Sequence, residues 1–417
     1  MERLYIQGGK RISGEIDVQG AKNSALPLLA ATILTEGKSV LHNCPDLSDI
    51  NAACKILSYL GCDVTYSGNT VTVDAANITN TDIPESLMSE MRSSIVFLGA
   101  LAARVGKTKL CFPGGCELGP RPIDLHLSSL RQLGLDIKEE HGYLDCHRTK
   151  RLRGAKIMLS FPSVGATENI MLASVTADGE TIITNAAGEP EIVDLADYLN
   201  KCGAKITGAG ESTVIIKGVD NLQGTEHSVI PDRIVASTYL CAGAITGGEL
   251  LIKKCNPTHI ESVLPVLEQT GCKIITGADN IYIRAPERLC HMETVRTMPY
   301  PGFPTDAQAP LMPLAVIANG TSVFVENIFE SRYKQVSELR KMGADIRIEG
   351  KVAVIEGVDR IYGANVRATD LRGGASLIIA GLAAEGETVI SDIYHIDRGY
   401  ERIEDNLRSI GAKIKRI

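Results

Sequence analysis

A sixfold internal repetition is the feature of this sequence that most limits the folds open to it. The pattern Leu-x-x-x-Gly recurs six times, and its glycines are spaced by 73, 69, 68, 72 and 68 residues. Self-similarity at a nearly fixed period indicates that one supersecondary unit is repeated along the chain. A leucine four residues before a glycine is typical of a helix that ends at a left-handed glycine. The six glycines are Gly61, Gly134, Gly203, Gly271, Gly343 and Gly411.

Each repeat has a second landmark, a small-residue apolar segment that ends in glycine 23 to 28 residues earlier. The segment Ser24 to Leu34 has almost no polar face, which predicts a helix buried on all sides. The segment before each Leu-x-x-x-Gly is amphipathic instead, as in Asp46 to Leu60. Two short segments with a turn signal follow each capping glycine and predict a hairpin. The expected repeat is strand, buried helix, strand, outer helix, then two strands.

The two ends of the sequence are expected to complete one repeat together. The sixth repeat lacks its last strand, and the strand-like segment Arg3 to Gln7 has no hairpin partner of its own. Six repeats in 417 residues exceed what one hydrophobic core holds, so they should divide into three and three. We therefore expect an α/β fold with one domain at 22–230 and another made of 1–21 plus 231–417. Two crossings between the domains would act as a hinge beside a cleft.

Composition narrows the classes of partner. The net charge of −7 argues against nucleic acid, so an anionic ligand would have to meet a local group of cations. The eleven cysteines form no C-x-x-C pair and no zinc-type spacing, and the first residues include no apolar signal-peptide core. A reduced, cytoplasmic protein without structural metal is expected. The apolar runs fall short of the roughly 20 residues of a membrane span, so we expect no membrane insertion.

Four of the six buried helices are expected to begin at a cation. A positive charge there opposes the helix dipole by roughly 0.3–1 kcal/mol, so the repeated placement favours a bound anion. The alternative is that each cation pairs with a carboxylate between repeats. Asp306 is either an ordinary N-cap or a weak base that accepts a proton from a hydroxyl. The six residues at the helix starts are Lys22, Arg92, Gly165, Arg233, Asp306 and Arg372.

The segment Cys111 to His126 is expected to form a loop that carries chemistry. Its three prolines and three glycines cannot continue a helix or a central strand. Two glycines free the backbone just before Cys116, whereas prolines on both sides hold Arg121 in an extended conformation. Cys116 is therefore either a small apolar filler or a reactive thiol beside a cation.

With these residues placed, the chain resembles the UDP-N-acetylglucosamine 1-carboxyvinyltransferase family of enolpyruvyl transferases from end to end. The resemblance implies a two-domain, inside-out α/β barrel that closes over phosphoenolpyruvate and UDP-N-acetylglucosamine without a cofactor or metal. The matching motifs are G-A-K-N-S-A-L-P (20–27), M-R-S-S-I (91–95), G-G-C-E-L-G-P-R-P-I-D-L-H (114–126), S-V-G-A-T (163–167), E-P-E-I-V-D (189–194), F-P-T-D-A-Q-A-P (303–310), T-D-L-R-G-G (369–374) and D-R-G-Y-E-R (397–402).

The resemblance also implies how phosphoenolpyruvate is held. Lys22, Asn23 and Arg121 match the residues that contact its phosphate side. Arg372 and Arg398 match the pair that clamps its carboxylate. Lys22 and Arg398 would thereby belong to the catalytic residues as well as to the binding residues.

Two further catalytic residues and the UDP-sugar contacts are implied in the same way. Cys116 matches a loop cysteine that donates a proton, can add to phosphoenolpyruvate and is alkylated by fosfomycin. Asp306 matches a residue beside the sugar 3′-hydroxyl. Some members carry a lysine where this chain has Phe161, so a nucleotide phosphate contact is not expected there. The implied UDP-sugar residues are Arg92, Arg121, Pro122, Ile123, Asp124, Leu125, Ser163, Val164, Gly165, Asp306 and Ile328.

The implied function is transfer of the enolpyruvyl group to the 3′-hydroxyl of UDP-N-acetylglucosamine with release of phosphate, the step that opens peptidoglycan synthesis. Two alternatives remain. Enolpyruvylshikimate-phosphate synthases share the six-repeat architecture, but they lack the G-G-C loop and differ in the first-helix motif. A sliding-clamp-like ring of αβ units would bind DNA without catalysis, but its pore helices would need polar faces that Ser24 to Leu34 lacks.

Overall fold

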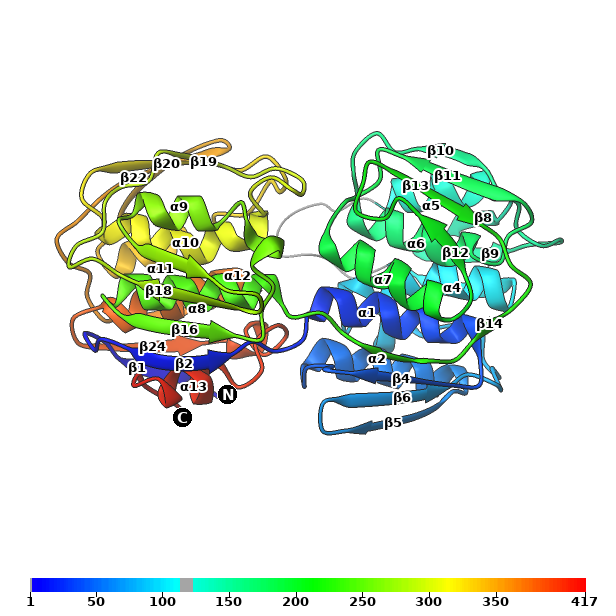
Figure 1. Cartoon of the computed structure of the whole chain (residues 1–417), viewed down its shortest axis with the longest axis horizontal. Helices are drawn as coiled ribbons and strands as arrows, with labels where there is room; N and C mark the ends of the chain where they lie inside the picture. Colours follow the sequence, from blue (N-terminus) through cyan, green and yellow to red (C-terminus); the bar gives the residue numbers. More distant parts are fainter. Residues whose placement is uncertain (1, 113–122) are drawn as a thin grey trace. The chain divides into compact units, whose positions relative to one another are not determined.

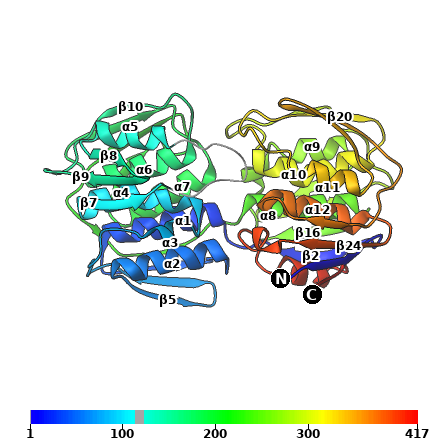
Figure 2. The same cartoon turned by 180° about the vertical axis from the view of Figure 1, so that it is seen from behind.

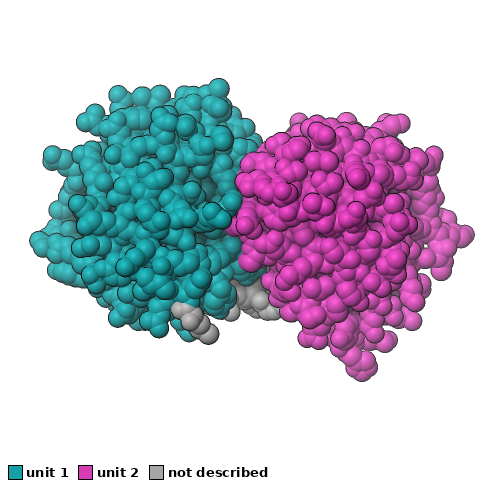
Figure 3. All heavy atoms as spheres, turned by 90° about the horizontal axis from the view of Figure 1, so that it is seen from below, with its two compact units in different colours: residues 1–19, 117–119, 231–417 teal, residues 20–116, 120–230 magenta. Residues whose placement is uncertain are grey.

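The computed structural model describes residues 2–112 and 123–417, except for the side chain of Arg92, and the chain forms two compact units (Figure 1). Among the described residues, unit 1 contains 2–19 and 231–417, and unit 2 contains 20–112 and 123–230 (Figure 3). Gly20 and Ala21, which the sequence grouped with the first segment, lie in unit 2, where the Ala21 N–H donates to the Ile230 carbonyl at 2.8 Å.

Unit 2 has apolar helices at its centre and amphipathic helices outside them. Every residue from Ser24 to Ala31 is buried, as the lack of a polar face predicts. Helix α4 contacts both α1 and α6. The central helices are α1 (Lys22–Ala31), the 3-10 turn η2 (Arg92–Val96) that runs into α4 (Phe97–Arg104), and α6 (Val164–Ser174); the outer helices are α2 (Ser48–Leu60), α5 (Asp124–Gln132) and α7 (Pro190–Lys201).

Three sheets cover the helices of unit 2, and the views from the two sides show strands outside the helices (Figures 1 and 2). The short strands β3 (Thr35–Glu36) and β14 (Leu222–Gln223) form a separate parallel pair. In the order of their pairing the sheets are β15 (Glu226–Ser228), β4 (Lys38–His42), β6 (Thr70–Asp74) and β5 (Asp63–Ser67); β10 (Lys156–Met158), β11 (Glu180–Thr184), β13 (Thr213–Lys217) and β12 (Lys205–Thr207); and β7 (Lys107–Cys111), β9 (Tyr143–His147) and β8 (Asp136–Glu140).

Unit 1 repeats this plan around three central helices that all contact one another. These are α8 (Arg233–Ile245), α10 (Thr305–Ile317) and α12 (Leu371–Ala383), with α9 (Leu264–Gln269), α11 (Val336–Lys341) and α13 (Ile403–Ser409) outside them. Its sheets are β17 (Lys273–Thr276), β18 (Asn280–Arg284), β16 (Glu249–Lys253) and β2 (Ser13–Asp17); β19 (Thr294–Arg296), β20 (Thr321–Val325), β22 (Val352–Glu356) and β21 (Asp345–Glu349); and β23 (Asn365–Arg367), β24 (Glu387–Ser391), β1 (Leu4–Gln7) and β25 (Lys413–Arg416).

The predicted landmarks of the repeat are confirmed. All six capping glycines have φ between 87° and 107°, a conformation that residues with a Cβ adopt at a cost of roughly 1–2 kcal/mol. The N-terminal strand does complete the sixth repeat, because β1 lies antiparallel between β24 and β25. Beyond the strand ends, Arg3 and Ile417 exchange both backbone hydrogen bonds, at 2.8 and 2.9 Å.

One feature of the pairing was not expected from the sequence. In three repeats the leading strand pairs in parallel with the strand that follows the same buried helix, as β10 does with β11, β19 with β20 and β23 with β24. In the first and fourth repeats, by contrast, the leading strand of each repeat pairs with the strand that follows the buried helix of the other repeat. Strand β2, which leads into α1, pairs with β16 after α8, and β15, which leads towards α8, pairs with β4 after α1. Each crossing thus leaves a strand fixed in the unit that the chain departs from.

Candidate active site

The start of α1 in unit 2 is a buried cation on an uncapped helix. Lys22 is 8% exposed, and its Nζ lies 3.0 Å from Oδ2 of Asp49 on α2. The N-cap residue, Ala21, offers no side-chain acceptor, so the positive end of the helix dipole remains beside the ammonium group. Asn23 is exposed next to it. The carboxylate partner that the sequence left open is present, and it fixes Lys22 at the helix start.

A second carboxylate ties the first turn of α1 to the other crossing of the chain. Asp194 on α7 accepts hydrogen bonds from Ser24 Oγ and from the Ile230 N–H, the latter at 3.4 Å. The His227 Nε2 lies 2.8 Å from the other carboxylate oxygen. Asp194 lies in the E-P-E-I-V-D motif, but the sequence gave no sign that its partners would be residues 24, 227 and 230.

Residues near the start of α6 also contact helix α5 of the preceding repeat. Ser163 caps this helix by accepting the Ala166 N–H at 3.3 Å. A Cβ on Gly165 would lie 3.0 Å from the His126 ring, so only glycine fits there without displacing the ring. His126 Nδ1 is 2.8 Å from Asn169 Nδ2, which joins α5 to α6. The half-buried Val164 belongs to the same turn.

The predicted residues around the Cys116 loop divide into two groups. Ile123 is buried and Leu125 half-buried, while Asp124 is exposed in the first turn of α5. The remaining residues, Cys116, Arg121 and Pro122, lie outside the described residues. For Arg92 only the backbone is described, and it begins η2.

Unit 1 brings three charged residues together at the starts of α10 and α12. Asp306 Oδ2 accepts from Arg372 Nη2 at 3.1 Å and Nε at 3.3 Å, and its Oδ1 accepts from Arg332 Nη2 at 2.8 Å. Both arginine side chains are 2% exposed, whereas the Asp306 side chain is 28% exposed. Arg332 was not predicted, because it lies in an irregular segment with no helix-start pattern.

The guanidinium group of Arg372 is charged and incompletely bonded. Burial lowers its pKa, but the neighbouring Tyr400, Asp306 and Asp232 together outweigh burial, so the pKa lies above its ordinary value. The guanidinium group makes a cation–π contact with Tyr400, with its carbon 5.3 Å from the ring centroid. Its Nη1 is buried and has no hydrogen-bond partner among the residues that the structure describes. A buried donor of this kind is suited to an anionic ligand.

The expectation that helix N–H groups are open to anions fails at α8 and α12. Asp232 Oδ1 accepts from the N–H groups of Ile234 and Val235, and Asp370 Oδ1 accepts from those of Arg372 and Gly373. These capping aspartates precede the cations by one or two residues and already occupy the N–H groups. At both starts the backbone N–H groups bonded to these aspartates are therefore not open to an anion.

The remaining predicted residues of unit 1 are Arg233, Ile328 and Arg398. The Arg233 guanidinium lies 5.7 Å from the Tyr300 ring centroid. Ile328 is half-buried, and its N–H donates to Glu326 Oε1 at 2.7 Å. Arg398 is half-buried in the loop that follows η4 (Ile393–His395).

No group of three or more metal-binding side chains occurs within 2–112 and 123–417, and no helix there is long and apolar enough to cross a membrane.

An acidic group in unit 2 was missed by the sequence analysis. Glu168 on α6 is 7% exposed, and burial, followed by the charges of Glu191 and Glu189, raises its pKa well above the ordinary value. In sequence, Glu168 only looked like one polar residue within an apolar helix.

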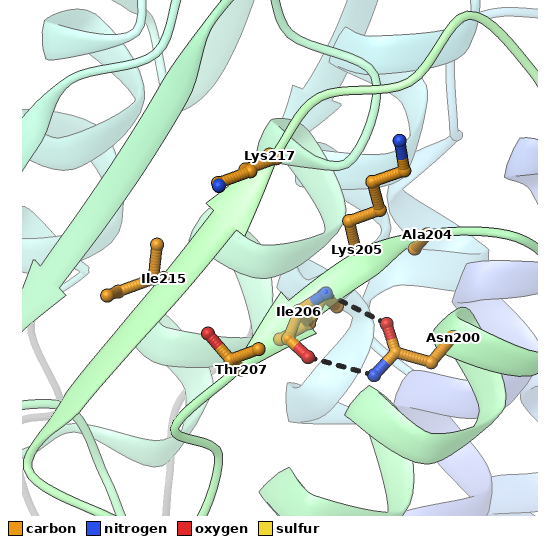
Figure 4. A pocket seen from close by; sticks show the side chains of 7 residues that line it. All are labelled: Asn200, Ala204, Lys205, Ile206, Thr207, Ile215 and Lys217. Carbon is orange, nitrogen blue, oxygen red and sulfur yellow. Dashed lines mark hydrogen bonds between the residues drawn. The ribbon is translucent and has the colours of Figure 1, made fainter.

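A surface hollow in unit 2 is separate from all these residues (Figure 4). It lies over β12 and β13, between Lys205 and Lys217. The one side-chain amide in it, Asn200, is already bonded to both backbone groups of Ile206, at 2.8 and 3.0 Å. The hollow therefore contains no predicted site residue.

Comparison with known proteins identifies the family. The chain matches the EPSP synthase (3-phosphoshikimate 1-carboxyvinyltransferase) family over residues 6–407. It is 54% identical over 417 residues to UDP-N-acetylglucosamine 1-carboxyvinyltransferase 2 of Caldanaerobacter subterraneus subsp. tengcongensis, with 100% of both chains covered. The chain belongs to the UDP-N-acetylglucosamine 1-carboxyvinyltransferase family. A second such relative, UDP-N-acetylglucosamine 1-carboxyvinyltransferase 1 of Symbiobacterium thermophilum, is 49% identical over 100% of this chain and 95% of its own.

Solved structures agree with this family. The enolpyruvyl transferase NikO from Streptomyces tendae has a TM-score of 0.90 at 26% identity, covering 100% of this chain and 98% of its own. EPSP synthase from Acinetobacter baumannii has a TM-score of 0.77 at 19% identity over 100% of both chains, which concerns the fold alone. The expected enolpyruvyl transferase fold is confirmed. The sliding-clamp-like ring is wrong, because the chain belongs to a family of transferases and because every residue from Ser24 to Ala31 is buried rather than lining a wet pore.

Proposed function

We propose that this protein transfers the enolpyruvyl group of phosphoenolpyruvate to the 3′-hydroxyl of UDP-N-acetylglucosamine and releases phosphate. The observation that carries the proposal is the 54% identity, over the full length of both chains, to a protein named for this reaction. The reaction opens peptidoglycan synthesis, and thus serves the cell wall, cell shape and cell division. We place the protein in the cytoplasm, where both phosphoenolpyruvate and UDP-N-acetylglucosamine would be available.

In this proposal Asp306 accepts the proton of the attacking hydroxyl. Its 28% exposed side chain leaves it accessible, and its bonds to two buried guanidinium groups keep it ionised and fixed. An ionised carboxylate so stabilised is a weak base, so proton transfer would accompany attack on the substrate carbon. Cys116 would supply the proton to the methylene carbon as the sugar oxygen bonds to the adjacent carbon. The resulting methyl group would then lose a proton while the bond between that adjacent carbon and the phosphate oxygen breaks, which restores the double bond and releases phosphate.

Cations would hold phosphoenolpyruvate while charge develops in the transition state. Arg372 supports this role because its buried Nη1 has no acceptor within the described part of the chain. Lys22, Asn23 and Arg121 would bind the phosphate side, and Arg398 would share the carboxylate with Arg372. Side chains fixed on rigid helix starts stabilise developing charge without the cost of reorganising solvent. Holding both substrates in one orientation also makes the reaction effectively intramolecular.

The UDP-sugar would be bound by the remaining family positions. We propose that Arg92, Asp124 and Ser163 contribute polar contacts to it, the first two from the second repeat and Ser163 from the third. Ile328 and Asp306 are also proposed to contact it. The other proposed positions are Arg121, Pro122, Ile123, Leu125, Val164 and Gly165.

A comparison of acceptors tests the function against its closest alternative, an enolpyruvylshikimate-phosphate synthase-like activity. We expect phosphate release from phosphoenolpyruvate with UDP-N-acetylglucosamine and none with shikimate 3-phosphate. The alternative gains weight from the family match over residues 6–407. Release with shikimate 3-phosphate alone would overturn the proposal.

A further inference from the structure

The loop at residues 397–401 carries Arg398 and is held at both ends by side chains from other elements of unit 1. Arg416 on β25 donates to Asp397 twice, from Nη2 to Oδ1 at 2.7 Å and from Nη1 to Oδ2 at 3.0 Å. This is the bidentate geometry that fixes a carboxylate most firmly. The same guanidinium donates to Glu404 at 2.7 Å, just beyond the loop. The residue before Arg398 is therefore anchored.

The other end of the loop is held by Gln19. Its Oε1 accepts the Glu401 N–H at 2.8 Å, and its Nε2 donates to the Gly399 carbonyl at 3.3 Å. One amide thus bonds to the backbone on both sides of Tyr400. Gln19 is half-buried, so these bonds are shielded in part from water.

The residue between these two bonds leads to the other proposed carboxylate-binding arginine. Tyr400 is 1% exposed, its ring lies 5.3 Å from the Arg372 guanidinium carbon, and its hydroxyl is 2.9 Å from Thr238 Oγ1 on α8. A Cβ on Gly399 would lie 2.8 Å from the Leu371 side chain. The loop can therefore shift little without breaking a bond or meeting a neighbour.

Gln19 also occupies a special place in the chain. It is the last residue of unit 1 before the first crossing, and its carbonyl accepts the Asp232 N–H at 2.9 Å beside the second crossing. Lys22 follows three residues later. The segment that leads to Lys22 is thus the segment whose side chain holds the Arg398 loop.

We propose that Gln19 is a positioning residue for Arg398 and that it sets the geometry with which Arg398 binds the carboxylate of phosphoenolpyruvate. The inference deepens the proposed function and rests on it. A guanidinium group frequently binds a carboxylate through two parallel bonds, and this geometry is lost when the loop is displaced. Misplacement of a binding group by 1 Å can lower a rate by about 100-fold.

The test compares Gln19→Ala with Gln269→Ala, a matched control in unit 1. The Gln269 Oε1 also accepts a backbone N–H, that of Glu293 at 3.1 Å. This bond joins residues that are more than 100 positions before the Arg398 loop in the sequence. We expect Gln19→Ala to lower kcat/KM for phosphoenolpyruvate by about tenfold. The KM for UDP-N-acetylglucosamine should change little in either variant, because the hydrogen bonds of Gln19 in the described part of the chain go to Gly399, Glu401 and Asp232, none of which is proposed to bind that substrate.

A double-mutant cycle shows whether Gln19 acts through Arg398. In an Arg398→Lys background the bidentate interaction is already lost, so Gln19→Ala should lower kcat/KM for phosphoenolpyruvate much less than it does in the wild type. An equal loss in both backgrounds would overturn the proposal. So would equal effects on the KM of both substrates, or a loss no greater than that of Gln269→Ala.

Hydrogen exchange tests the proposal without relying on activity. In Gln19→Ala the amide of Glu401 should exchange faster, while the amides of β25 should keep their rates. Unchanged exchange at residue 401 would overturn the positioning role. If the wild type released no phosphate from phosphoenolpyruvate and UDP-N-acetylglucosamine, the proposed function would fail while this measurement still decided whether Gln19 holds the loop.

Discussion

Asp306 is held by two buried arginines, and this arrangement fixes its charge as well as its position. Each carboxylate oxygen has its own guanidinium partner, Arg332 on Oδ1 and Arg372 on Oδ2. Breaking either pair would leave a buried cation without its partner, which commonly destabilises a protein by 3–5 kcal/mol. The pairing of opposite charges and a role in catalysis are therefore compatible at this residue.

Cys116 should be the preferred target of fosfomycin, because most of the other cysteine thiols are buried. Burial raises the pKa of nine of the ten described cysteines, for example that of Cys44 to about 12 and that of Cys202 to about 11. A thiol attacks an electrophile as its thiolate, so these groups react slowly near neutral pH. We expect a mass spectrum of the treated protein to place one adduct on Cys116. The exposed Cys290 is the internal control, and an adduct there or on Cys44 would contradict the prediction.

Replacement of Glu168 by glutamine should stabilise the protein at neutral pH. The ordinary pKa of 4.5 is raised in the folded state by burial and then by Glu191 and Glu189. Below pH 4.5 Glu168 is protonated in both the folded and the unfolded protein. As the pH rises from 4.5 through the raised pKa of the folded protein, the unfolded state loses its proton first, so the wild type becomes less stable towards unfolding. The melting temperature of Glu168→Gln should therefore exceed that of the wild type by more at pH 8 than at pH 5. Glu211→Gln, at an exposed position of unit 2, should show no such trend.

The helix ends show how one local rule recurs with different surroundings. Gly61 and Gly203 both end an outer helix of unit 2, with φ of 102° and 107°. A Cβ on Gly203 would meet nothing within 4 Å, whereas one on Gly61 would lie 2.7 Å from the Asn77 carbonyl oxygen. Backbone conformation alone decides the first case, and the second adds a collision with backbone.

These two glycines give a matched pair of substitutions. Gly203→Ala should lower the free energy of unfolding by roughly 1–2 kcal/mol, the cost of a left-handed alanine. Gly61→Ala should lower it further, because the Asn77 backbone has to move. Denaturant unfolding of both variants measures the difference. Equal losses would show that the neighbouring segment adapts freely.

The order of the elements could be predicted from sequence, whereas the partner of each strand could not. Glycine C-caps and small-residue helices leave local signals, and these located all six repeats. Strand β2 would show the same alternation of side chains whether it paired with β16 or with a strand of its own repeat. The capping residues Asp232 and Asp370 did leave a local signal, an aspartate one or two residues before a cation, that could have corrected the expected anion sites.

At the scale of the whole molecule, each unit has a hydrophobic core of its own. Ile6 on β1 belongs to the core of unit 1, and Leu41 on β4 to that of unit 2, and both are 0% exposed. The unit 1 core therefore depends on a strand from the start of the sequence, inserted between β24 and β25.

Truncation of each residue should destabilise mainly its own unit. Ile6→Ala and Leu41→Ala should each cost about 2–5 kcal/mol. Hydrogen exchange should become faster across unit 1 in Ile6→Ala and across unit 2 in Leu41→Ala. If either variant accelerated exchange equally throughout the chain, the two units would unfold as one.

The same reasoning explains how much of the candidate site could be foreseen. Lys22, Asp306 and Arg372 were found because they stand at the starts of recognisable helices. The pairing of these residues was not foreseen, because Asp49 is 27 residues from Lys22 and Asp306 is 66 residues from Arg372, separations that leave no local pattern. Gln19 was missed for the same reason, at 380 residues from Gly399.

The mutual hydrogen bonds of Arg3 and Ile417 hold these two residues side by side, so the elements of this fold could be joined in a different order along the chain. A short glycine-rich linker could join these residues as the turn of an additional hairpin, and fresh ends could then be opened at the β5–β6 or β21–β22 turn. Such circularly permuted chains would carry every contact of the present fold in a different order, so a library of them would report which junctions the protein needs to be continuous.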